Sequence, residues 1–101
     1  MMTSLEKYPL EEPALEKTVR ISNKRGLHAR AAAKFVKLVE DRKVDVTVFK
    51  DDMSVCGSSI MGLLMLSASL DTHIRITVKG NNAAAALEEL VGLVERRFDE
   101  E

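Results

Sequence analysis

The first candidates for chemistry in this sequence are a histidine and an arginine two residues apart. They lie in the run Gly26-Leu27-His28-Ala29-Arg30, where a loop with a turn glycine meets a segment of helical periodicity. The start of a helix presents unpaired backbone N–H groups and a partial positive charge, so it stabilises an anion such as a phosphoryl group. The same field disfavours the charged imidazolium, which suits a nucleophilic His28. Arg30 can bring a permanently charged guanidinium to the phosphate.

Three nearby basic residues support an anion site at this end of the molecule: Lys24, Arg25 and Lys34. The placement of His28 alone also fits an ordinary surface or capping histidine. His73 lies inside a strand pattern and is interpreted as structural or exposed, and Cys56 as a small packed residue. These residues offer no zinc ligand set and no Cys–His pair, and no P-loop or dinucleotide glycine motif occurs. An autonomous enzyme is therefore not expected, and no metal or cofactor is predicted.

A second segment of interest runs from Ser58 through an apolar stretch to Leu66. Ser59 is a good N-cap for a short helix of about two turns, which is its purely structural interpretation. Leu63 and Leu66 are three residues apart and can face the core. The other apolar positions then fall on a different face: Ile60, Met61 and Leu64. An exposed apolar cluster with a methionine suits an adaptable docking surface, although these side chains could equally complete a small core.

Size and composition limit the classes of protein that remain. A chain of 101 residues forms one domain, and a net charge of −1 argues against a nucleic-acid binder that relies on bulk positive charge. The single cysteine cannot form an internal disulfide, which favours a reducing compartment. The sequence shows neither an apolar run of about 18 residues nor a secretory signal, so we expect a cytoplasmic protein without a membrane span.

Hydrophobic periodicity predicts seven elements in the order strand, helix, strand, strand, short helix, strand, helix. Their expected ranges are 18–22, 29–40, 44–49, 53–56, 60–66, 74–79 and 83–98. On the first long helix a buried stripe is predicted at Ala32, Phe35, Val36 and Val39, and on the last at Leu87, Leu90, Val91, Val94 and Phe98. This order predicts an α+β fold in which helices cover one face of a mainly antiparallel sheet.

Residues 1–16 contain both prolines, several acidic residues and no sustained period. We interpret them as a flexible N-terminal extension with a short helical turn around Leu15. The folded domain is then expected to span residues 17–101.

Together the two motifs resemble those of the HPr family of phosphocarrier proteins from the bacterial phosphoenolpyruvate-dependent phosphotransferase system. Gly26-Leu27-His28-Ala29-Arg30 is similar to the family's active-site motif and Ser59-Ile60-Met61-Gly62-Leu63 to its second motif. The spacing from His28 to Ser59 also agrees with the family pattern (59 − 28 = 31 residues). The resemblance covers roughly residues 19–98. It implies an open-faced β-sandwich of order βαββαβα, with four antiparallel strands and three helices on one face.

The resemblance also implies the function. His28 would receive a phosphoryl group on Nδ1 from enzyme I and donate it to a histidine of an enzyme IIA protein, while Arg30 stabilises the phosphate. Ser59 would be the position that an HPr kinase/phosphorylase modifies in many members. A shuttle that docks alternately with two partners is expected to be a monomer, and catalysis belongs largely to those partners.

The sequence departs from the family pattern at one position beside each motif. Ala31 stands where most members have proline, and Ser58 where many have lysine before the regulatory serine. Ala31 and the ending Arg97-Phe98-Asp99-Glu100-Glu101 look closer to the nitrogen-related NPr branch. Two alternatives stay open: a regulatory interaction module of the same fold switched by phosphorylation of Ser59, and an unrelated small α+β enzyme with His28 as general base.

Overall fold

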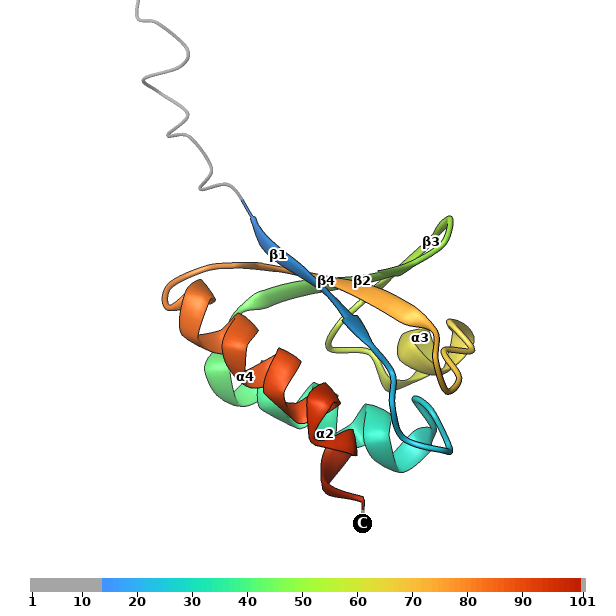
Figure 1. The fold of residues 1–101 in the computed structure, drawn as a ribbon. Helices are drawn as coiled ribbons and strands as arrows, with labels where there is room; N and C mark the ends of the chain where they lie inside the picture. Colours follow the sequence, from blue (N-terminus) through green and yellow to red (C-terminus); the bar gives the residue numbers. More distant parts are fainter. Residues whose placement is uncertain (1–13, 101) are drawn as a thin grey trace, which may run out of the picture.

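A four-stranded antiparallel sheet covered by helices on one face forms the protein, as seen in a computed structural model that describes residues 14–100 (Figure 1). The predicted element order and fold class are confirmed. Along the chain the elements are β1 (Leu15–Arg20), α2 (Ala29–Arg42), β2 (Asp45–Lys50), β3 (Met53–Cys56), α3 (Ile60–Met65), β4 (His73–Lys79), α4 (Ala83–Glu95) and a 3-10 turn η1 (Arg97–Asp99).

The strands lie in the order β1-β4-β2-β3, and each pairs with its neighbour in antiparallel register. Val46 lies opposite Val78 and Val48 opposite Ile76, so the alternating valines and isoleucines of β2 and β4 meet on one face. These side chains are buried, whereas the residues between them are exposed or half-buried. The period-2 pattern therefore reflects one face packed on the helices and one open face.

Helices α2 and α4 cover the apolar face of the sheet side by side (Figure 1). Helix α3 lies beside the N-terminal part of α2. All nine side chains of the two predicted apolar stripes are buried. Leu63 of α3 joins the same core, as predicted. Among residues 14–100, no helix is both long enough and apolar enough to cross a membrane.

The structure corrects two element boundaries. Strand β1 begins at Leu15, so the predicted helical turn around this residue is wrong. Leu15 pairs with Val78 of β4, a long-range contact that local periodicity does not reveal. The last helix ends at Glu95 and does not continue to Phe98, which has a left-handed backbone (φ 55°). Residues 1–13 of the predicted extension lie outside the described part of the chain.

Candidate functional site

His28 is the N-cap of α2, and its imidazole takes part in the cap. Its backbone is extended (φ −80°, ψ −179°), and its Nδ1 accepts a hydrogen bond from the Arg30 N–H at 3.3 Å. The first intrahelical bond runs from Ala32 N–H to the His28 carbonyl at 2.8 Å. Because an acceptor nitrogen of a neutral imidazole carries a lone pair, this geometry places the proton on Nε2 and leaves Nδ1 as the nucleophilic atom.

The loop before His28 is fixed against the segment that follows α3. Gly26 has φ +65°, and a Cβ at this position would lie 2.5 Å from the Ala68 carbonyl oxygen, so only glycine fits. The next residue, Leu27, is buried and donates its N–H to the same oxygen at 2.9 Å. These contacts hold the start of α2, and with it the histidine, at a defined distance from the second motif.

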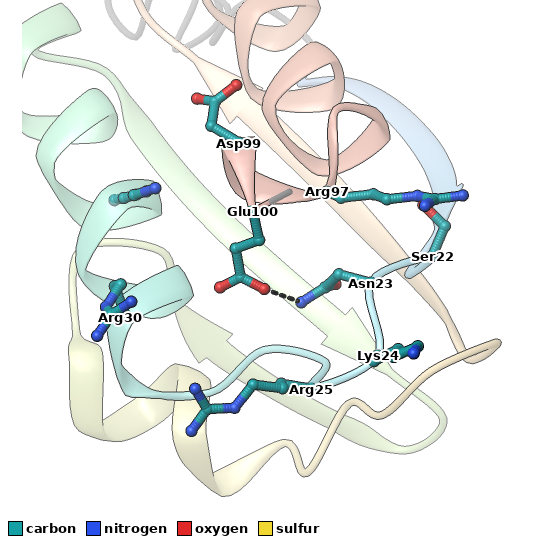
Figure 2. Close-up of a pocket in the computed structure, with 9 residues that line it drawn as sticks. Ser22, Asn23, Lys24, Arg25, Arg30, Arg97, Asp99 and Glu100 are labelled. Carbon is teal, nitrogen blue, oxygen red and sulfur yellow. Dashed lines mark hydrogen bonds between the residues drawn. The ribbon is translucent and has the colours of Figure 1, made fainter.

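On the other side of the ring, Nε2 of His28 contacts Oε2 of Glu100. The second carboxylate oxygen of Glu100 accepts a hydrogen bond from Nδ2 of Asn23 at 3.1 Å, drawn as a dashed line in Figure 2. The same Nδ2 also donates to the Gly26 carbonyl at 2.8 Å. Burial alone would raise the pKa of Glu100, but the hydrogen bonds from His28 and Asn23 outweigh it and hold this pKa below its ordinary value.

An unusual turn after α4 brings Glu100 to the histidine. Arg97, Phe98 and Asp99 all have φ between 55° and 60°, a left-handed conformation that costs about 1–2 kcal/mol for each residue with a side chain. Burial of the Phe98 ring and a 2.7 Å hydrogen bond from Lys34 Nζ to the Phe98 carbonyl offset this cost. The turn is therefore held in place by the core and by α2.

A positively charged cleft of about 600 Å³ lies between this turn and the His28 loop (Figure 2). Five cationic and two anionic side chains line it together with Ser22 and Asn23: Lys24, Arg25, Arg30, Lys34, Arg97, Asp99 and Glu100. The three basic residues that the sequence suggested do meet here, and Arg30 joins them. The excess of positive charge next to a helix N-terminus suits an anion.

Ser59 is the N-cap of α3, as predicted from the second motif. Its Oγ accepts a hydrogen bond from Gly62 N–H at 2.9 Å, and the side chain is half-buried. The structure corrects the interpretation of Cys56, which is exposed and not packed. Its Sγ lies 3.0 Å from Oγ of Ser58, and hydrogen bonds with this serine lower the pKa of the thiol.

The apolar cluster on α3 is only partly the predicted one. Ile60 and Met61 are 41% and 68% exposed, whereas Leu64 is half-buried and packs against the core. Met65, which the sequence reasoning did not single out, is 63% exposed. Residues three and four apart share a helix face, so Met61 and Met65 lie together at the surface. His73 is exposed at the start of β4 and does not line the cleft.

Sequence reasoning missed Asn23 and Glu100 as parts of the site. Asn23 is the one buried polar residue of residues 14–100, and its Oδ1 has no hydrogen-bond partner there. Glu100 lies 72 residues from His28 in the sequence. No local pattern marks either residue, because their role depends on the turn that folds back after α4. Residues 14–100 contain no group of three or more acidic, histidine or cysteine side chains arranged to hold a metal ion.

Comparison with known proteins places these features in context. Residues 15–96 match the family model described as the PTS HPr component phosphorylation site. The chain is 46% identical to phosphocarrier protein HPr of Pseudomonas aeruginosa, over 87% of this chain and 97% of that protein. It is 40% identical to phosphocarrier protein NPr of Shewanella violacea, over 85% and 94% of the two chains. The crystal structure of HPr from Thermoanaerobacter tengcongensis superposes with a TM-score of 0.82 at 38% identity, covering 86% of this chain and 98% of that one.

Proposed function

The chain belongs to the HPr family, the phosphocarriers of the phosphotransferase system, and we propose that Nδ1 of His28 is the atom that carries the phosphoryl group. One observation supports this choice above the others. Nδ1 accepts a hydrogen bond from the Arg30 N–H in the first turn of α2, so its lone pair lies at the positive end of a helix, and the Arg30 side chain lines the cationic cleft. A phosphoryl group bonded to Nδ1 would enter that field directly.

The transfer itself needs little from this chain beyond position and charge. Nδ1 attacks phosphorus in the phosphohistidine of enzyme I; the new N–P bond forms as the old one breaks, and the electron pair returns to the donor imidazole. Arg30 and the other cleft cations balance the charge of the phosphoryl oxygens. The same steps in reverse pass the group to a histidine of an enzyme IIA protein. An open cleft suits a carrier, because a phosphoryl group held too tightly would not leave.

The partners are enzyme I as donor and enzyme IIA proteins as acceptors, and the chain works as a cytoplasmic monomer that docks with each in turn. The exposed side chains of Ile60 and Met61 form the docking contact, with Leu64 supporting them from below. A flexible methionine adapts to two different partner surfaces. This chain acts as a phosphocarrier and leaves catalysis to the proteins that it meets.

Ser59 is a second site of phosphorylation within the same proposal, with an HPr kinase/phosphorylase as the enzyme. A phosphate on Oγ would add about −2 charge at the start of α3, beside the docking contact. At a helix start this charge is locally tolerated, because phosphate oxygens can accept hydrogen bonds from the N–H groups of the first turn, where Ser59 Oγ now caps Gly62. The alternative of a purely regulatory module rests on this serine alone, whereas the His28 geometry favours the carrier.

The test is labelling by phosphoenolpyruvate and enzyme I. We expect one acid-labile phosphoryl group on the unaltered chain and none on His28→Ala. His73→Ala is the matched control, because His73 is the other histidine of the chain and is exposed. It should label like the unaltered protein. Labelling of His28→Ala at the same level would exclude His28 as the acceptor.

A further inference from the structure

We propose that Glu100 is a positioning residue that directs the incoming phosphoryl group to Nδ1 of His28 by occupying Nε2. The inference rests on the proposed function, since it concerns the same histidine. An imidazole has two nitrogens of similar nucleophilicity, and a small phosphoryl donor can react at either one. The protein must therefore contain something that makes them different, and the contacts of the two ring nitrogens differ in kind.

The two nitrogens of His28 face opposite electrostatic environments. Nδ1 meets a donor, the Arg30 N–H, and Nε2 meets an acceptor, the carboxylate of Glu100. With the proton on Nε2 both contacts are hydrogen bonds, whereas the other tautomer would lose both. Glu100 also covers its side of the ring, because the His28 side chain is only 15% exposed. By accepting a hydrogen bond from Nε2–H, the carboxylate thus keeps the proton on Nε2, orients the ring and shields this nitrogen.

Contacts from the His28 loop and from α2 hold Glu100 itself in place. Asn23 is buried, and its Nδ2 donates hydrogen bonds to both the Glu100 carboxylate and the Gly26 carbonyl. These bonds connect the carboxylate to the His28 loop. The left-handed turn before Glu100 is a conformation that persists only where its surroundings enforce it. Lys34, on α2, fixes this turn through the Phe98 carbonyl. These contacts converge on the position of one carboxylate.

The reaction that follows is balanced without proton release. When Nδ1 forms its bond to phosphorus, the ring becomes a phosphoimidazolium with its proton still on Nε2. The Glu100 carboxylate faces this new positive charge. It therefore stabilises the product state that is most ready to transfer the group onward. The carboxylate acts through the histidine and does not touch the phosphoryl group.

The regiochemistry of phosphorylation tests the proposal without any partner protein. The probe is phosphoramidate, which transfers its phosphoryl group as its P–N bond breaks and ammonia leaves with the electron pair. The full chain is used in a His73→Ala background, so that His28 is the one histidine present. Phosphorus and nitrogen NMR spectra then show which ring nitrogen carries the group. The variants are Glu100→Ala, Glu100→Gln, which keeps a hydrogen-bond acceptor, and Glu95→Gln, an exposed charge change on α4.

We expect the background protein and Glu95→Gln to react at Nδ1. In Glu100→Ala the ratio of Nδ1 to Nε2 product should fall about tenfold, the equivalent of one lost hydrogen bond, and Glu100→Gln should restore most of it. A Glu100→Ala protein that still reacts at Nδ1 with the original ratio would overturn the proposal. So would an equal loss in Glu100→Gln, or reaction mainly at Nε2 in the background protein. Since enzyme I is absent, these results are independent of the labelling test for His28.

Discussion

Replacing Ala31 by proline removes one backbone donor from the place where the phosphoryl group would sit. At the start of α2, Arg30 N–H already binds Nδ1 and the first intrahelical bond begins at Ala32. The N–H of Ala31 belongs to the four that a helix start leaves without an intrahelical acceptor. Ala31 itself is fully buried, so water does not reach this N–H, and we expect a phosphoryl oxygen on His28 to be its acceptor. Proline has no N–H, but it is tolerated in a first helical turn.

The size of the effect follows from the exposure of this turn. A hydrogen bond to a charged group contributes about 1.5–3 kcal/mol when it is sheltered. Arg30 and Ala29 beside it are exposed, so solvent competes for the phosphoryl oxygens. Halving the contribution for this competition gives about 0.75–1.5 kcal/mol, which is roughly a four- to thirteenfold change in an equilibrium constant. The equilibrium constant for phosphoryl transfer to the Ala31→Pro protein should be lower by this factor.

The assay is an equilibrium between phosphorylated enzyme I and the carrier at limiting phosphoenolpyruvate, read as the phosphorylated fraction of each protein. Ala31→Gly is the matched control because it keeps the N–H. It should show the equilibrium of the unaltered chain, although its helix will be less stable by about 1 kcal/mol. Ala31→Pro with an unchanged equilibrium would refute the reasoning. A shift of the same size in Ala31→Gly would point to helix stability instead of the lost donor.

Three further predictions concern the same surface. Arg30→Ala should slow phosphoryl transfer from enzyme I by at least about tenfold. Its urea unfolding should stay unchanged, since Arg30 is exposed, and an unchanged transfer rate would exclude a role for this residue. Met61→Asp should raise KM for enzyme I by about tenfold and leave the melting temperature close to that of the unaltered protein. A large drop in melting temperature would instead place Met61 in the core. Because hydrogen bonds hold the pKa of Glu100 below its ordinary value of 4.5, its stabilisation is present above that pH and disappears as the pH falls through the lowered pKa. The N–H of residue 100 donates to the Arg97 carbonyl at 3.0 Å, so its protection against amide exchange should decrease as the pH falls below about 4.5, and not in Glu100→Gln.

Most of the fold was predictable because its elements are amphipathic with clear periods. The alternating valines of β2 and the stripe from Ala32 to Val39 each specify one buried face, and the structure packs these faces together. The errors lie at the ends of elements. Leu15 becomes a strand residue only through its partner Val78, which is 63 residues away (78 − 15 = 63). Pairings of that kind leave no trace in a local window.

The candidate site was predictable only in part, for a related reason. His28 and Ser59 both stand at helix starts, and N-caps leave a local signature. Glu100 depends on a left-handed turn at Phe98, a conformation that residues with side chains rarely adopt and that no sequence pattern here suggests. Phe98 lies four residues after Val94, which is the spacing that would continue the apolar stripe of α4. Its burial was therefore correct, but the helix that was expected to carry it was not.

The position of β4 between β1 and β2 has a consequence for how the protein is made. Strand β1 has β4 as its sheet neighbour, and 52 residues separate Arg20 from His73 in the sequence (73 − 20 − 1 = 52). At a synthesis rate of about 5–20 residues per second, β1 waits about 3–10 s before its partner exists. During that time the apolar side of β1 and the helix α2 behind it lack their final packing. Strand β1 therefore enters the sheet only after β4 has been synthesised, and Val19, its one buried side chain, cannot reach its final packing before then.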